Sequence, residues 1–225
     1  MPDPVDTAAF VEFLVRADVL TFGDFVTKSG RPTPYFLDFG RVRTGEQVTT
    51  LGAFYADRIV TTFGRDVDVL FGPAYKGIPL AVATSIALAD RHDLDVAFCF
   101  DRKEAKDHGE GGSLVGHVPA DGDRVVIVED VTTAGTSIRE TVPLLRAAAD
   151  IDLRGLVVSV DRAERGTGTM SALAEVGRDH QMTTTAITDI DTVVAHLRDH
   201  DVDGRRVLGT DDLERIAAYR RTWGA

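Results

Sequence analysis

Cysteine, lysine and long apolar segments are scarce in this sequence or missing from it. The one cysteine, Cys99, excludes a disulfide bond within the chain, and its apolar neighbours predict a buried strand position. No apolar run approaches the length of a membrane-spanning helix. The N-terminus, MPDPVDTAAF, lacks the basic segment and the apolar core of a signal peptide. The sequence therefore predicts a cytoplasmic protein without membrane contacts.

Positive charge is also in short supply. The formal net charge is −11 at pH 7, which argues against a nucleic-acid partner because such a surface needs a basic face. Only four of the 25 Lys and Arg residues are lysines, namely Lys28, Lys76, Lys103 and Lys106. If these cations gather at one place on so acidic a chain, they concentrate positive potential where an anion must enter.

Apolar strands and helices alternate from about residue 46 onward. The 225 residues include 44% hydrophobic and 27% charged residues, which are ordinary globular values. We expect strands at 66–72, 96–100, 124–130, 154–162 and 183–188, and helices at 46–63, 78–92, 137–149, 170–180, 191–200 and 211–221. This pattern predicts an α/β fold, with a mainly parallel central sheet flanked by helices. Ligands of such a fold bind outside the carboxyl ends of the strands.

The first 45 residues have a different pattern. A helix is expected at about 5–17, and two short strand-like segments with Gly and Pro between them follow. We interpret residues 1–45 mainly as a small hood or flap over the sheet. Residues 46–225 are then the α/β core with the C-terminal helices, and 1–225 is a single domain.

The segment VVIVEDVTTAGTSIRET, residues 125–141, ends a predicted buried strand with two adjacent acids, Glu129 and Asp130. The loop after them consists of Val131, Thr132, Thr133, Ala134, Gly135, Thr136 and Ser137. Backbone N–H groups and hydroxyls of such a small-residue loop favour an anion, whereas the acids suit ribose hydroxyls or a metal-bound water. The pattern predicts a site for a sugar that carries a phosphate. The alternative is an ordinary strand-to-helix turn with Thr136 as the N-cap.

The segment RKEAKDHGEGG, residues 102–112, places several cations close together. Arg102, Lys103, Lys106 and His108 lie within seven residues, and a glycine cluster follows them. This combination is typical of a lid that closes over a charged leaving group. The alternative is a flexible surface loop without a function.

These motifs together resemble a known family. The strand, the two acids and the small-residue loop resemble the phosphoribosyl-diphosphate motif of type I phosphoribosyltransferases. Four further segments resemble the orotate phosphoribosyltransferases of that fold: KSGRPTPYFLDFG (28–40), FGPAYKGIP (71–79), RKEAKDHGEGGS (102–113) and VDRAERG (160–166). The similarity extends over about residues 10–222 in one order.

The resemblance implies two sets of binding residues. The phosphoribosyl diphosphate would contact Lys28, Tyr75, Lys76, Arg102, Lys103, Lys106, His108, Glu129, Asp130, Val131, Thr132, Thr133, Ala134, Gly135, Thr136 and Ser137. Orotate would contact Tyr35, Phe36, Thr133 and Arg162. Tyr35 and Phe36 offer a flat surface to a pyrimidine, and Arg162 offers a planar fork to its carboxylate or ring edge. The acid pair is commonly Asp-Asp in the family, whereas Glu129 takes the first position here.

The resemblance also implies a reaction and an assembly. N1 of orotate would replace the diphosphate at C1 of 5-phosphoribosyl 1-diphosphate, with Arg102, Lys103, Lys106 and His108 as the catalytic residues. Mg²⁺ is the implied cofactor, held mainly by substrate oxygens and water and not directly by the protein. In a homodimer with shared active sites, Arg102, Lys106 and His108 would serve the partner's site, and Lys103 its own.

Two other functions remain open on these residues. One alternative is a phosphoribosyltransferase for another nucleobase, such as uracil or a purine, although Arg162 and the two aromatic residues argue for orotate. The other alternative is a non-catalytic regulator that keeps the fold only to sense the phosphoribosyl donor. Such regulators are expected to carry a nucleic-acid surface, which this acidic chain does not predict.

Overall fold

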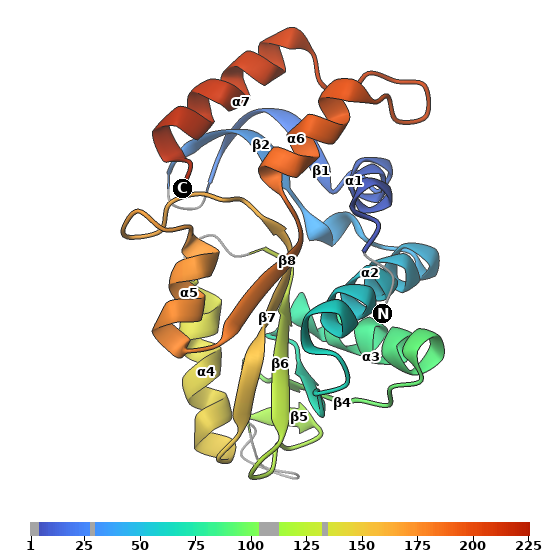
Figure 1. The fold of residues 1–225 in the computed structure, drawn as a ribbon, viewed down its shortest axis with the longest axis vertical. Helices are drawn as coiled ribbons and strands as arrows, with labels where there is room; N and C mark the ends of the chain where they lie inside the picture. The colour runs from blue at the N-terminus through green and yellow to red at the C-terminus, as the bar shows by residue number, and fades with distance from the viewer. Residues whose placement is uncertain (1–4, 28–29, 104–112, 132–134) are drawn as a thin grey trace.

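A six-stranded, mainly parallel sheet forms the centre of the molecule (Figure 1). The computed structural model describes residues 5–27, 30–103, 113–131 and 135–225. The strand order is β5-β4-β3-β6-β7-β8, and only the pairing of β5 with β4 is antiparallel. The strands are β3 (Val69–Phe71), β4 (Ala97–Asp101), β5 (Leu114–Gly116), β6 (Arg124–Glu129), β7 (Asp152–Asp161) and β8 (Thr183–Asp189). The predicted fold class is confirmed, and β5 is a strand that the sequence did not predict.

Helices cover both faces of this sheet (Figure 1). The helices α2 (Gly45–Phe63) and α3 (Gly77–His92) lie on one face, and α4 (Thr136–Ala148) and α5 (Ala172–His180) lie on the other. Along β6, Val126 and Val128 belong to the apolar cluster beneath the first pair, whereas Val125 and Ile127 belong to the cluster beneath the second. All four residues are fully buried, so the strand is apolar throughout and not alternating.

The N-terminal and C-terminal parts of the chain pack against each other above the carboxyl ends of the strands. The N-terminal part contains α1 (Thr7–Arg16), the antiparallel pair β1 (Leu20–Val26) and β2 (Pro32–Leu37), and the short 3-10 helix η1 (Phe39–Arg41). The C-terminal part contains α6 (Ile190–Asp199) and α7 (Thr210–Trp223). Helix α7 packs against β2, and α1 packs against α6 and β8 (Figure 1). The expected hood therefore rests on the C-terminal helices as well as on the sheet.

Helix α4 begins one residue earlier than the sequence predicted. Its N-cap is Gly135, not Thr136, and Gly135 has a positive φ of 68°. A Cβ atom at this position would lie 2.5 Å from Cγ2 of Val176, so both the backbone angle and the space favour glycine. The strand expected at 66–72 is also shorter, since β3 spans only Val69–Phe71. None of the helices in the described ranges has the length and apolarity to cross a membrane.

Candidate active site

The candidate site lies where the strand order reverses. Strands β3 and β6 are neighbours at the centre of the sheet, yet α3 after β3 and α4 after β6 lie on opposite faces (Figure 1). Ligands of open α/β sheets usually bind at such a switch point, and the region beyond the carboxyl ends of β3, β6 and β7 is called the crevice below. The predicted residues Lys76 and Asp130 follow β3 and β6, so they flank this crevice.

The turn between β3 and α3 brings Lys76 into the crevice. A Cβ atom on Gly72 would lie 2.0 Å from the carbonyl oxygen of Gly77, so only glycine permits this close approach. The Ala74–Tyr75 peptide within the turn is cis, and the Tyr75 side chain is exposed. Nζ of Lys76 lies 3.0 Å from Oδ2 of Asp130.

Lys76 also approaches the hood, because its Nζ atom is 4.0 Å from Oδ1 of Asp38. Asp38 is the N-cap of η1, and its carboxylate accepts from the backbone N–H of Gly40. One exposed ammonium group thus lies near carboxylates from β6 and from the hood.

The two adjacent acids at the end of β6 have different surroundings. Glu129 is buried, and its carboxylate accepts hydrogen bonds from the hydroxyl of Ser137 at 2.8 Å and the N–H of Asp130 at 3.2 Å. Burial raises the pKa of Glu129 to about 7, and the charge of Asp130 adds to the shift while Ser137 opposes it. The Asp130 carboxylate instead accepts from Lys76 and from the N–H of Val131. The acids therefore have different partners: among the described residues, Asp130 contacts a cation and Glu129 does not.

The strands β4 and β5 hold the two ends of the predicted lid together. The N–H of Arg102 donates to the carbonyl of Ser113 at 2.8 Å, and Nζ of Lys103 lies 3.4 Å from Oδ2 of Asp101. The other oxygen of Asp101 accepts from the N–H of Ala74 at 2.6 Å. Asp101, which sequence reasoning overlooked, thus links the start of the lid to the turn that carries Lys76.

Arg162 lies at the other end of the crevice, after β7, and is almost fully buried. Its Nε and Nη2 atoms donate to Oε1 of Glu164 at 2.9 and 2.6 Å, and Nη2 also donates to the hydroxyl of Thr33. Its guanidinium carbon lies 4.5 Å from the ring centre of Tyr35. Two predicted orotate residues, Arg162 and Tyr35, are therefore in contact.

The structure corrects the prediction that Tyr35 and Phe36 form one flat surface. Successive residues of a strand point to opposite faces, and here Tyr35 is fully buried while Phe36 is exposed and stacks with Phe25. The hydroxyl of Tyr35 donates to Glu164 at 2.9 Å. Of the two rings, only Phe36 is open to solvent.

Glu164 joins three parts of the fold, and sequence reasoning missed it. Its carboxylate accepts from Arg162, from Tyr35 of β2, from Tyr219 of α7 at 2.8 Å and from Arg31 at 3.0 Å. Burial alone would raise the pKa of Glu164, but Arg162 and the two tyrosine hydroxyls lower it overall. An acid two residues after Arg162 in VDRAERG was the available signal, since a buried arginine needs a partner.

Several predicted residues fall outside the described part of the chain. They are Lys28, Lys106, His108, Thr132, Thr133 and Ala134, and the side chain of Thr136 is also outside the description. Of residues 131–137, the predicted phosphate loop, the structure describes Val131, Gly135 and Ser137 in full. Their predicted contacts with a phosphate remain predictions.

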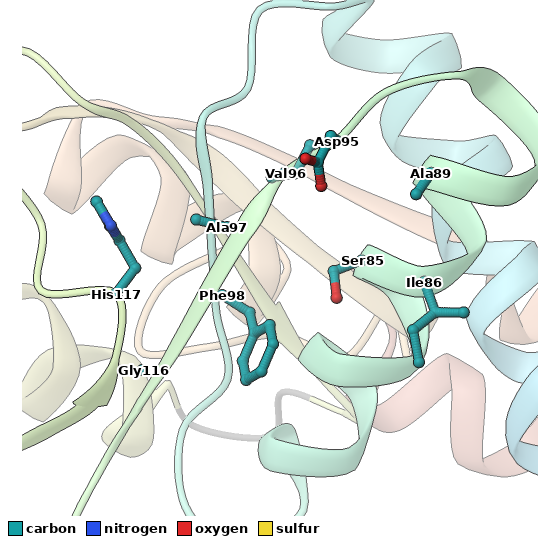
Figure 2. Close-up of a pocket in the computed structure, with 9 residues that line it drawn as sticks. All are labelled: Ser85, Ile86, Ala89, Asp95, Val96, Ala97, Phe98, Gly116 and His117. Atoms are coloured by element: carbon teal, nitrogen blue, oxygen red, sulfur yellow. The ribbon is translucent and has the colours of Figure 1, made fainter.

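A hollow of about 450 Å³ lies away from this crevice, between α3 and the β4–β5 edge (Figure 2). Ser85 and Ile86 of α3 face Phe98 of β4 across it, and His117 lies on the far side of β4 (Figure 2). Its lining contains none of the predicted site residues. A second hollow, of about 330 Å³, borders β8.

Known proteins resemble this chain in sequence and in structure. Residues 41–169 match the family model described as a phosphoribosyl transferase domain. The chain is 52% identical to the orotate phosphoribosyltransferase of Clostridium beijerinckii, over 96% of both chains. It is also 52% identical to that of Lachnoclostridium phytofermentans, again over 96% of both. The crystal structure of orotate phosphoribosyltransferase from Francisella tularensis has a TM-score of 0.81 and 33% identity, covering 96% of this chain and 100% of that one.

Proposed function

This chain belongs to the orotate phosphoribosyltransferase family and acts in pyrimidine biosynthesis, and we propose that the two ends of its crevice divide the reaction between them. The enzyme transfers the 5-phosphoribosyl group of 5-phosphoribosyl 1-diphosphate to orotate, giving orotidine 5′-monophosphate and diphosphate. The bond from N1 of orotate to C1 forms as the bond from C1 to the diphosphate oxygen breaks. The observation that carries the division of roles is the meeting of Lys76 and Asp130 at the β3–β6 switch point.

The end with Lys76 and Lys103 receives the phosphoribosyl diphosphate. Both ammonium groups are half-exposed and each lies against a carboxylate, Asp130 and Asp101 respectively. Exposed pairs of this kind contribute only about 0–1 kcal/mol, so phosphate oxygens can replace the carboxylates at small cost. Lys103 then stabilises the charge that develops on the departing diphosphate. Arg102, Lys106 and His108 share this role by family resemblance.

The two acids at the end of β6 bind the ribose. Ribose hydroxyls donate hydrogen bonds, and ionised carboxylates accept them. Asp130 lies beside Lys76, where its charge is compensated, so it can face a ligand that also carries phosphate. Glu129 is buried and has a pKa of about 7, so its capacity to accept from a hydroxyl depends on pH near neutrality.

The end with Arg162 receives the orotate ring. Among the ion pairs of the described residues, Arg31 and Arg162 share the single carboxylate of Glu164, so this cluster carries one excess positive charge. An anionic base such as orotate balances that charge, whereas a neutral base such as uracil does not. Thr133 and the exposed ring of Phe36 complete the proposed contacts.

Mg²⁺ is part of the same proposal. Carboxylate oxygens and water suit this ion, and Glu129 and Asp130 place carboxylates beside the phosphate loop. Their oxygens already accept hydrogen bonds from N–H and O–H donors, so they suit contacts with water bound to the ion better than direct coordination. When bound, Mg²⁺ would neutralise charge on the diphosphate.

We further propose a homodimer with shared sites, which the lid implies by family resemblance. The side chains of Ile86 and Val118 are exposed apolar groups close to β4 and β5, the strands that begin and end the lid segment. A second copy covering this face would remove both from water. Ile86→Asp should therefore weaken the dimer, measured by analytical ultracentrifugation.

Mixing an Arg162→Ala variant with a Lys106→Ala variant tests the shared site. Each variant should be inactive alone, and the mixture should regain activity, because one site in each hybrid dimer is intact. A mixture as inactive as its parts would contradict donation of Lys106 to the partner.

The direct test is formation of orotidine 5′-monophosphate from orotate and the donor, with and without Mg²⁺. We expect product only when orotate, donor and the metal ion are all present, and no inhibition by excess uracil. Product from uracil would favour a phosphoribosyltransferase for another base. Donor binding without release of diphosphate would favour a regulator.

A further inference from the structure

We propose that Glu164 is a positioning residue, which holds the Arg162 guanidinium in one orientation toward the base. The proposal rests on the assignment of this end of the crevice to orotate. It concerns how Arg162 is aimed and not whether Arg162 binds the base.

The first argument is the number of hydrogen bonds on one carboxylate. Oε1 of Glu164 accepts from Nε and Nη2 of Arg162 and from the hydroxyls of Tyr35 and Tyr219, and Oε2 accepts from Arg31. Glu164 is 7% exposed and Arg162 is 5% exposed, so water competes little with these bonds. Charged hydrogen bonds away from water are both strong and directional.

The second argument is what these contacts leave free on Arg162. Glu164 occupies the edge formed by Nε and Nη2, and the ring of Tyr35 covers one face of the guanidinium. Within the described part of the chain, Nη1 is the one nitrogen of Arg162 for which no partner is found. A guanidinium held in this way presents Nη1 to a ligand as a hydrogen-bond donor in one fixed orientation.

The third argument is the backbone between the two residues. Ala163 has a φ of +47°, a conformation that residues other than glycine rarely adopt. Its N–H donates to the carboxylate of Asp161, and its carbonyl accepts from Nη1 of Arg220 on α7. This turn allows Arg162 and Glu164 to face the same buried space.

The fourth argument is that the bonds cross element boundaries. Tyr35 and Arg31 belong to the hood, and Tyr219 belongs to α7. Arg31 in addition lies over the ring of Trp223, with 4.2 Å between its guanidinium carbon and the ring centre. Glu164 therefore fixes Arg162 relative to the hood, which carries Tyr35 and Phe36.

Two substitutions separate position from charge. Glu164→Asp keeps the charge but shortens the side chain by one methylene, so the carboxylate cannot reach all of its donors. Glu164→Gln keeps the length and one acceptor oxygen for Arg162 and the tyrosines, and Arg31 can turn to solvent. A positioning role predicts that the Asp variant raises the KM for orotate by roughly tenfold or more, the scale of one lost charged hydrogen bond. The Gln variant leaves the buried Arg162 without its counter-charge and should be less stable to heat, but its KM for orotate should stay within about fivefold of wild type because the acceptor oxygen is preserved.

The matched control is Glu175→Gln. Glu175 is also a buried glutamate of this region, and it accepts from the N–H groups of Thr167 and Gly168. No contact between Glu175 and Arg162 is found among the described residues. This variant should lower thermal stability without changing the ratio of the KM for orotate to the KM for the donor.

The outcomes are distinct. A raised orotate KM in Glu164→Asp, with an unchanged donor KM, supports the positioning role. An unchanged KM ratio in that variant, or a larger loss in Glu164→Gln than in Glu164→Asp, overturns it. Wild-type chain that forms no nucleotide from orotate would instead refute the proposed function, independently of Glu164.

Discussion

The two ends of the crevice hold their cations in different ways. At the phosphate end, the side chains of Lys76 and Lys103 are 54% and 45% exposed, and each lies against a carboxylate of the strand ends. At the base end, the side chain of Arg162 is 5% exposed and is fixed by Glu164 and the ring of Tyr35. One end therefore has cations in exchangeable pairs, and the other has a cation in a fixed network.

The difference follows from what each end must bind. A diphosphate leaves during the reaction, so its cations must form new contacts and then release them, and weak exposed pairs allow this. A pyrimidine ring is small and rigid, and its N1 atom must be aligned with C1 of the ribose. A fixed arginine suits that task because little of its conformational freedom is lost when the base binds.

The largest expected effect is at the phosphate end. Lys103→Ala should lower kcat by roughly 10²–10³-fold, because it removes one charge donor to the transition state. The fold should be unchanged, since the side chain is half-exposed. Steady-state kinetics at saturating substrates measure the effect, and Arg198→Ala, which breaks an exposed pair with Asp199, is the control. Near-normal turnover in Lys103→Ala would show that Lys103 has no catalytic role.

The next largest effect is expected at Glu129, which lies between the two ends of the crevice. Because the folded state holds a proton on Glu129 more tightly than the unfolded state, it binds more protons between about pH 4.5 and 7. The free energy of unfolding should therefore fall as pH rises through this range, by roughly 3 kcal/mol in total. Glu129→Gln should lack this fall. Urea denaturation of both proteins from pH 5 to 8 measures it, and parallel curves would show that Glu129 ionises normally.

A smaller effect is expected at Lys76. Lys76→Ala should raise the KM for the donor by about tenfold, the scale of a charged hydrogen bond at a partly exposed site. The KM for orotate should stay unchanged, because Arg162 and its network do not contact Lys76 among the described hydrogen bonds. Initial rates with each substrate varied in turn test this. An equal rise in both KM values would mean that the two ends are not separate.

The smallest effect is expected at the edge of the base network. Trp223→Leu removes the ring over Arg31, an interaction of about 0.5–1 kcal/mol. The KM for orotate should therefore rise by about two- to fivefold, and the donor KM should not change. If the rise equals that of Glu164→Asp, the network depends on the packing of α7 and not on the hydrogen bonds of Glu164.

Much of the fold was predictable because its signals are local. Helical spacing marked α2 and α3 to within a residue or so, and a buried apolar run marked β6. β5 was not predicted, because the three residues LVG carry no alternation or length that distinguishes a strand. The start of α4 was misplaced by one residue, because the left-handed angle of Gly135 and its lack of space for a side chain beside Val176 are seen only in the folded chain.

The candidate site was predictable in its chemistry and only partly in its geometry. The motif residues Lys76, Asp130 and Arg162 all lie at the carboxyl ends of strands, as the α/β pattern requires. The partner of Arg162 was missed, and Tyr35, which was expected to offer a flat surface to the base, is fully buried. Both errors concern burial, which depends on elements distant in sequence, such as α7.

The sequence by itself determined the α/β pattern, the chemical groups at the strand ends and the family, because spacing and side-chain chemistry are properties of short segments. Only the tertiary structure decided which groups meet. Lys76 and Asp130 are 54 residues apart, and they are in contact because β3 lies beside β6. Glu164 collects donors from the hood and α7 because both pack above the end of β7. Such contacts depend on strand order and burial, and no short segment of the chain contains that information.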